Sequence, residues 1–215
     1  MKTRDRIIQA ALELFNESGE PNITTNHIAA HLSISPGNLY YHFRNKEEII
    51  HCIFDEYARD ISTRFQPRAE FDATAESLLV YLDAVFMLMW RYRFFYANLP
   101  DILSRDQALQ CKYLQAQEQL HTNIVLLMNS FKSSELLDLD DGELLSLANT
   151  LKLVASSWIF YQTTQVPGAK ITKTVIYQGV LQVLSIVRPL TTVKGRERVK
   201  QLELHYSEQV QHDLT

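Results

Sequence analysis

The 215-residue sequence is poor in glycine, proline and cysteine. Six glycines and six prolines leave few positions for turns, so we expect long helices with few connections. The two cysteines, Cys52 and Cys111, lie in helical contexts without activating neighbours. They are typical of reduced thiols in a cytosolic protein, although the pattern leaves a redox role open.

Long apolar runs and catalytic motifs are also missing. No apolar run reaches the roughly 18 residues that a membrane-crossing helix needs, and the opening MKTRDRIIQAALELF has helical periodicity instead of a signal-peptide core. There is no G-x-S-x-G, H-E-x-x-H, phosphate-loop or C-x-x-C motif. His27 and His31 share one helical face, but no third metal ligand accompanies them. We therefore expect a cytoplasmic protein that is not an enzyme and has no cofactor, no metal and no membrane partner.

Acidic residues are missing from one part of the chain. The formal net charge of −4 does not by itself favour a nucleic-acid partner. From Pro21 to Lys46, however, the sequence has no Asp or Glu, whereas it has Arg44, Lys46 and three histidines. This segment does not repel phosphate, so the acidic total does not exclude nucleic-acid binding there.

Apolar residues recur at helical spacing along the chain, and no segment shows a convincing strand-like alternation. The first helix is expected to begin at a Thr3 cap and to end at Gly19. A second helix follows a cap at Thr24 or Thr25, and a third begins at Pro36 after a tight connection. Three short helices, with a short turn between the second and the third, are typical of a helix-turn-helix unit.

Longer helices are expected after this unit. Asn45 and Glu48 resemble a capping box at the start of the fourth helix. The expected ranges are 47–65, 74–92, 94–99 with an end at Pro100, 105–131, 142–165 with a cap at Asp140 or Asp141, 172–189 and 194–212. The sequence thus predicts an all-α fold of about nine to ten helices.

The segment SPGNLYYHF in the third helix has more aromatic side chains than so short a helix can bury. Leu39 and Phe43, four residues apart, fill its narrow inward face. The side chains left to face outward are those of Asn38, Tyr40, Tyr41 and His42. Such polar tips and flat rings suit contacts with phosphates, sugars and base edges in a DNA major groove. The alternative is that one tyrosine, Tyr41 more than Tyr40, packs against the first or the fourth helix.

Residues 23–50, ITTNHIAAHLSISPGNLYYHFRNKEEII, resemble the helix-turn-helix signature of TetR-family transcriptional regulators. The resemblance covers about residues 3–60, and beyond them only the helical plan and the length are similar. It implies a helix-turn-helix DNA-binding domain at 1–50 and an effector-binding and dimerisation domain at 51–215. Pro36 departs from the family pattern, in which several relatives carry a polar or basic side chain. The residues to which the resemblance assigns DNA contacts are Thr25, Asn26, Ser35, Pro36, Gly37, Asn38, Tyr40, Tyr41, His42 and Lys46.

The resemblance implies a homodimer, and the geometry of DNA favours one too. One recognition helix covers few base pairs, whereas two about 34 Å apart can read a palindromic operator. The helix expected near 171–189 is apolar on nearly all sides and must be covered on more than one face. With the helix at 142–165 we expect it to form half of an intersubunit four-helix bundle. The alternative is a core helix of a monomer.

Aromatic and methionine side chains concentrate at residues 81–96 and 158–161. Large, flexible apolar linings suit a small hydrophobic effector. The candidate pocket residues are Phe86, Met89, Trp90, Phe95, Gln115, Glu118, His121, Trp158 and Tyr161. The alternatives are core packing for the apolar members and solvated surface for the polar members.

These expectations together describe a ligand-responsive regulator, most simply a repressor, that binds double-stranded operator DNA as a homodimer. The resemblance implies that effector binding shifts the helix at 47–65 and so changes the separation of the two recognition helices. Two other classes stay open. One is an all-α enzyme, for which no convergent catalytic groups are evident, and the other is a helical ligand-binding or adaptor protein that does not bind DNA.

Overall fold

A computed structural model describes residues 2–64, 74–166 and 168–212. Within these ranges the chain forms ten α-helices and two 3-10 turns, and the sole β-type pairing is an isolated bridge between Leu137 and Thr191. The prediction of an all-α fold is confirmed. No helix in the described part of the chain is long and apolar enough to cross a membrane.

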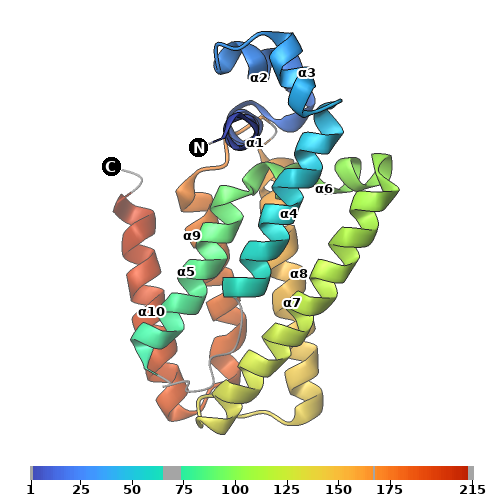
Figure 1. Cartoon of the computed structure of the whole chain (residues 1–215). Coiled ribbons are helices and arrows are strands. Elements are labelled where there is room, and N and C mark those ends of the chain that lie inside the picture. The colour runs from blue at the N-terminus through green and yellow to red at the C-terminus, as the bar shows by residue number, and fades with distance from the viewer. Residues whose placement is uncertain (1, 65–73, 167, 213–215) are drawn as a thin grey trace.

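Three helices form a head at one end of the molecule (Figure 1). They are α1 (Thr3–Ser18), α2 (Thr25–His31) and α3 (Pro36–His42), with a 3-10 turn, η1 (Glu20–Asn22), between α1 and α2. The short connection between α2 and α3 and the length of both helices match the predicted helix-turn-helix unit.

Seven further helices form the part that we call the body. They are α4 (Lys46–Arg64), α5 (Ala75–Arg91), α6 (Arg93–Arg105), α7 (Gln107–Ser133), α8 (Asp141–Gln165), α9 (Lys173–Val187) and α10 (Val193–His212), with a second 3-10 turn, η2 (Arg188–Leu190), after α9. α9 packs against both α8 and α10, and α7 packs against α4 and α8. α4 runs from the head down into the body (Figure 1), so it belongs to both parts. The helix end predicted near Phe65 and the stop predicted at Pro167 lie outside the described residues.

Side chains cap the two helices of the helix-turn-helix unit. The Thr24 hydroxyl accepts a hydrogen bond from the His27 N–H at 3.3 Å, so Thr24 is the cap of α2. The Ser35 hydroxyl accepts one from the Asn38 N–H at 3.1 Å at the start of α3. Pro36 occupies the first position of α3, where its missing N–H costs no hydrogen bond.

Two other predicted helix starts differ in detail. Thr3 does not cap α1, because it lies inside the helix, and the preceding Lys2 makes no side-chain cap bond. Before α4, Asn45 Oδ1 accepts a hydrogen bond from the Glu48 N–H at 2.9 Å, as a capping box requires. Glu48 Oε2 accepts its bond from the Arg44 N–H at 2.8 Å, one residue before the position expected. The predicted capping box is therefore half formed.

The expectation that Pro100 ends a short helix is wrong, because α6 continues through it. A proline removes one backbone hydrogen bond and crowds the preceding turn. Phe94 and Phe95 on one side of the proline and Ile102 on the other are all buried, and this apolar burial outweighs the cost. α6 ends before Asp106, whose side chain caps α7.

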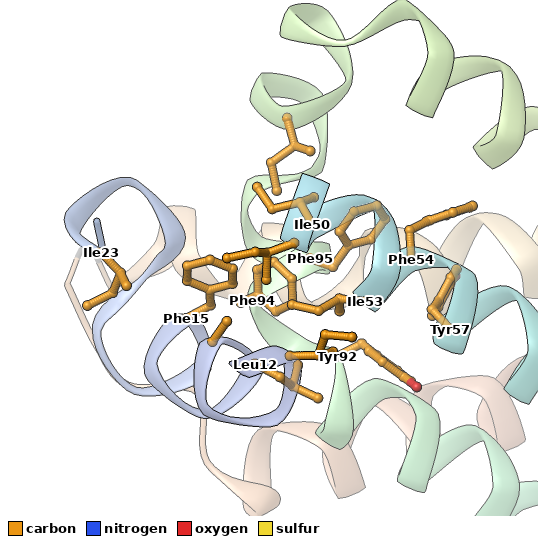
Figure 2. Close-up of a cluster of buried hydrophobic side chains, with 14 of the residues drawn as sticks. Leu12, Phe15, Ile23, Ile50, Ile53, Phe54, Tyr57, Tyr92, Phe94 and Phe95 are labelled. Carbon is orange, nitrogen blue, oxygen red and sulfur yellow. The ribbon is translucent and has the colours of Figure 1, made fainter. Parts of the chain in front are cut away.

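Aromatic side chains join the head to the body in one core (Figure 2). Phe15 of α1 lies against Phe94 of α6, with 5.2 Å between the ring centroids. Phe54 and Tyr57 of α4 each lie 5.7 Å from Phe95 of α6. The apolar core is thus continuous from α1 through α4 to α6. The domain boundary near residue 50 stays a prediction, and α4 crosses that position without a break.

Gly195, near the start of α10, is expected to tolerate no side chain. A Cβ at this position would clash with the carbonyl oxygen of Leu136, a backbone atom that cannot rotate away. Gly195→Ala should lower the free energy of unfolding, measured by urea denaturation, by about 1–3 kcal/mol. Gly37→Ala is the control, because its Cβ would meet nothing nearer than 3.9 Å, and it should be neutral or slightly stabilising. A Gly195→Ala protein as stable as the wild type would contradict this close approach.

Candidate functional site

The outward face of α3 carries the side chains that the sequence singled out. Leu39 and Phe43 are buried, with 0% and 2% of their surface exposed. Tyr41 is 85% exposed, Tyr40 is 50% exposed and His42 is half-buried. The predicted division of this segment into a buried face and an outward face is confirmed.

The alternative that assigned inward packing to Tyr41 is wrong. Tyr40 is the tyrosine that packs back, and it does so onto α2: its hydroxyl lies 3.0 Å from Thr25 Oγ1. Consecutive residues of a helix point about 100° apart, so Tyr40 and Tyr41 cannot both face α2. Tyr41 projects into solvent, with its ring edge-on to that of His42 at 5.1 Å between centroids.

The other predicted DNA-contacting residues of the helix-turn-helix unit lie where α2 and α3 begin. Thr25 is half-buried, and its bond to Tyr40 brings the start of α2 next to α3. The residues with exposed side chains or backbone are Asn26, Ser35, Pro36, Gly37 and Asn38. Ser35 is already engaged as the cap of α3, whereas no described hydrogen bond holds the Asn38 side chain.

Lys46 has an intramolecular partner that the sequence did not indicate. Its Nζ lies 2.7 Å from Glu20 Oε1 and donates a hydrogen bond to the Glu20 carbonyl oxygen at 3.0 Å. The Lys46 side chain is 18% exposed, so a phosphate contact would have to compete with a buried carboxylate. Its DNA contact stays a prediction. Arg44, two residues earlier, is 90% exposed and was not among the predicted contacts.

Glu20 links the head to the body. Its side chain is completely buried, and its second oxygen, Oε2, accepts a hydrogen bond from Arg105 Nη2 at 3.0 Å. A buried carboxylate is stable only with such partners, and here one partner begins α4 and the other ends α6. In the sequence Glu20 lies between two helix-stopping residues, Gly19 and Pro21, which marked it as part of a turn and hid its role.

Two more polar side chains, Asn16 of α1 and His51 of α4, make contacts that join helices of the head and the body. Asn16 of α1 donates to the Arg91 carbonyl at 2.8 Å and accepts from the Phe94 N–H at 3.0 Å, so it joins the end of α5 to the start of α6. His51 Nε2 of α4 lies 2.7 Å from Asp106 Oδ2, on the residue that caps α7.

His27 also has a local partner. Its Nδ1 accepts a hydrogen bond from the Thr24 N–H at 3.3 Å and completes the capping box of α2. Among the residues that the structure describes, no group of three or more His, Cys, Asp or Glu side chains is placed to hold a metal ion.

The body contains a cavity of about 180 Å³. One water needs about 10–15 Å³ on this measure, so the cavity has room for a small organic molecule. Its walls come from helices α4 to α10 and consist mainly of leucine, valine, isoleucine and methionine side chains. α4 contributes Tyr57, three turns after the helix leaves the head.

Two of the nine predicted pocket residues, Met89 and Trp158, line this cavity. Phe86 and Phe95 are buried but pack elsewhere. Phe86 stacks on Tyr177 with 4.4 Å between the ring centroids, and Phe95 belongs to the aromatic core between head and body. The alternative that the sequence left open, core packing, is therefore correct for these two side chains.

The predicted pocket residues that do not line the cavity also include Trp90, Gln115, Glu118, His121 and Tyr161. Gln115 and Glu118 are exposed, because α7 turns Gln117, Leu120 and Ile124 toward the cavity. A shift of two residues rotates a side chain by about 200° around the helix, which is nearly the opposite face. Leu120 and Ile124 are apolar and four residues apart, and this spacing was the sequence signal that could have predicted which face of α7 points into the cavity.

Trp90 and Tyr161 lie outside the cavity for different reasons. The Trp90 ring packs under the Arg93 guanidinium, 4.1 Å from its centroid, and Tyr161 is 51% exposed. His121 is half-buried and does not line the cavity.

Polar side chains that the sequence did not single out do line the cavity. They are Gln117 of α7, Lys152 and Ser156 of α8, Thr191, and Arg198 of α10. Tyr57 and Tyr96 add two phenols whose oxygens lie 3.2 Å apart. Burial raises the pKa of both Tyr57 and Tyr96, so both stay protonated at neutral pH and can donate hydrogen bonds.

Two family models together match most of the chain. The model "Bacterial regulatory proteins, tetR family" matches residues 7–53, and the model "Bacterial transcriptional repressor" (TetR) matches residues 56–199. The chain belongs to the TetR family. The first model covers the head and the start of α4, and the second covers most of the body and so includes the cavity walls.

The chain is also similar to individual transcriptional regulators. A crystal structure of a TetR-family transcriptional regulator from Marinobacter aquaeolei VT8 is 37% identical over 96% of this chain and 99% of that chain, with a TM-score of 0.85. TtgW of Pseudomonas putida, an uncharacterized HTH-type transcriptional regulator, is 34% identical over 39% of this chain. The class A tetracycline repressor from transposon 1721 of Escherichia coli is 36% identical over 31% of this chain. The matches span 63% and 31% of the lengths of these two curated relatives.

Loss of the Glu20 charge should destabilise the protein. Glu20→Gln leaves the mostly buried Lys46 and the half-exposed Arg105 without their shared carboxylate, so the free energy of unfolding should fall by about 2–4 kcal/mol. Asp101→Asn is the matched control, because Asp101 pairs with the same Arg105 at 3.2 Å but is 65% exposed. It should cost less than about 1 kcal/mol. Equal losses in the two variants, measured by urea denaturation, would contradict the role of Glu20.

The Asp106 cap should make stability depend on pH. Burial alone raises the pKa of Asp106, but hydrogen bonds from the Leu109 N–H and from His51 outweigh it and hold the pKa below its ordinary value. The stabilisation is therefore present above the ordinary aspartate pKa, about 4, and is lost as the pH falls through the lower folded value.

Asp106→Asn is thus expected to lower the free energy of unfolding by about 1 kcal/mol at neutral pH, and by less at about pH 3. Asp138→Asn is the control, since Asp138 is exposed. Denaturant titrations across this pH range measure the difference, and an Asp106→Asn deficit that grows toward low pH would contradict the assignment.

Proposed function

We propose that the chain is a DNA-binding transcriptional regulator, a ligand-responsive repressor that binds a palindromic operator as a homodimer. The observation that carries the proposal is the outward face of α3, on which Tyr41 is 85% exposed. The absence of acidic side chains from Pro21 to Lys46 supports it, since the surface does not repel a phosphate backbone.

In this proposal α3 lies in the major groove. Tyr41 and Asn38 are free to reach base edges or phosphates, because no described side-chain hydrogen bond holds either of them. Tyr40 and Thr25 hold each other, so they fix the angle between α2 and α3 in addition to any contact they make. Gly37 leaves room for the backbone to approach the DNA.

The homodimer is supported by apolar side chains left exposed on α8. Leu145 is 49% exposed, Leu153 65% and Phe160 45%. Their spacing of eight and seven residues places them on one face of the helix. A stripe of this kind suits burial against a second copy, and α8 is one of the two helices from which the sequence predicts an intersubunit bundle.

α4 is proposed to couple ligand to DNA. Its Tyr57 lines the cavity, and its first residue, Lys46, is held by Glu20 of the head. A ligand that fits the cavity better in one position of α4 favours that position and moves the head with it. Coupling then requires only a difference in ligand affinity between the two spacings of the recognition helices.

Tyr41→Ala tests the proposed interface. The variant should bind a duplex taken from the DNA upstream of its own gene at least about tenfold more weakly, because a groove contact is lost. Its stability should not change, since Tyr41 is 85% exposed. Fluorescence anisotropy at fixed salt measures the affinity, and thermal denaturation checks the fold.

Leu114→Ala on α7 is the control, as a large side chain with 60% exposure far from the head in sequence. It should leave DNA affinity unchanged. A wild-type chain that binds this duplex no better than random DNA would count against the proposal and favour a helical adaptor. A Tyr41→Ala variant that binds as well as the wild type would contradict the interface proposed for α3.

A further inference from the structure

The charged side chains described in the cavity wall are all positive. Lys152 and Arg198 both line the cavity, and no Asp or Glu is among its described lining residues. α8 and α10 lie on either side of α9, so the two cations stand in different walls. An apolar cavity with two cations and no carboxylate attracts an anion and repels a cation.

Neither of these cations has a carboxylate partner among the described residues. Lys152 Nζ donates to the Gln117 carbonyl at 3.3 Å, and Arg198 Nη1 donates to Gln201 Oε1 at 3.4 Å. Arg198 Nε is buried and has no hydrogen-bond partner in the described structure. An unpartnered, buried donor of a charged group is costly and calls for a ligand that accepts its hydrogen bond.

Several other cations of the described chain are paired with a carboxylate. Lys46 and Arg105 lie within 3.0 Å of Glu20, and Arg91 lies 2.9 Å from Glu56. Arg93 of α6 is half-buried without an ion pair to a described residue, but it donates a hydrogen bond to the Trp90 carbonyl at 2.9 Å and lies over the Trp90 ring. Arg198 differs from these cations because its buried Nε has no partner in the described structure. Arginine stays charged at any physiological pH, and its Nε and terminal nitrogens together match the two oxygens of a carboxylate.

We propose that the cavity takes an amphipathic carboxylate, with an aliphatic body against the apolar walls and its carboxylate paired with Arg198. The proposal names the class of effector and so rests on the regulator function proposed above. Lys152 of α8 adds to the positive potential without being the main contact. A cationic amphipath is disfavoured, because it would meet two like charges and no acid.

Calorimetry on the DNA-free, full-length protein tests this ligand class with three molecules of matched chain length. Decanoate should bind at least about tenfold more tightly than 1-decanol, and decyltrimethylammonium should bind most weakly. Trp158 in the cavity wall gives a second readout, because its fluorescence should change on binding. Equal binding of decanoate and 1-decanol, or tighter binding of decyltrimethylammonium, would overturn the proposal.

Arg198→Met tests the partner of the carboxylate. It should weaken decanoate binding by about tenfold or more and leave 1-decanol binding unchanged. Its melting temperature without ligand should not fall, because the buried Nε–H that lacks a partner is removed. Arg198→Gln serves as a second variant should the methionine variant fold poorly.

Arg196→Met is the matched control, because Arg196 is exposed on the same helix two residues earlier, and it should bind decanoate as the wild type does. Lys152→Met should weaken decanoate binding less than Arg198→Met does. The reverse order would overturn the assignment of the carboxylate to Arg198.

The outcome separates the ligand class from the regulator function. A chain that binds its upstream duplex but shows no preference for decanoate refutes the ligand class alone. A chain that binds decanoate with this dependence on Arg198 but binds no DNA refutes the regulator function and leaves the ligand assignment standing.

Discussion

The packing of α1 and α4 against the aromatic residues of α6 is the contact on which the rest of the structure depends. Phe15 and Phe54 bring two helices of different parts of the chain onto Phe94 and Phe95. This packing couples the head to α4 and α6, because close-packed interiors resist continuous deformation. A seven-residue helix such as α3 could not hold its orientation without this support.

Polar contacts restrict the relative positions of the helices that this apolar packing brings together. The buried carboxylate of Glu20 has to keep both Lys46 and Arg105 within reach, which restricts how the start of α4 can move relative to the end of α6. Asn16 fixes the junction of α5 and α6 against α1 in the same way. Apolar packing supplies most of the stability, and these hydrogen bonds and ion pairs select one arrangement of the packed helices.

The cavity lies where a ligand can act on this arrangement. Tyr57 stands in its wall and in the aromatic cluster with Phe95 at the same time. A molecule in the cavity therefore contacts the same helix that carries the head. Lys152 and Arg198 of the wall have no carboxylate partner in the described structure and make the site selective by charge, whereas its apolar surface alone would accept many hydrophobic molecules.

The sequence by itself determined the local features. Helical periodicity, the Thr24 and Ser35 caps and the inward pair Leu39 and Phe43 follow from interactions between residues a few positions apart. Only the tertiary structure decided which tyrosine packs against α2 and that α6 runs through Pro100. Those outcomes, like the partners of Glu20 and the exposure of Arg198 to the cavity, depend on contacts between residues far apart in the chain. A single sequence carries no periodic signal for such contacts.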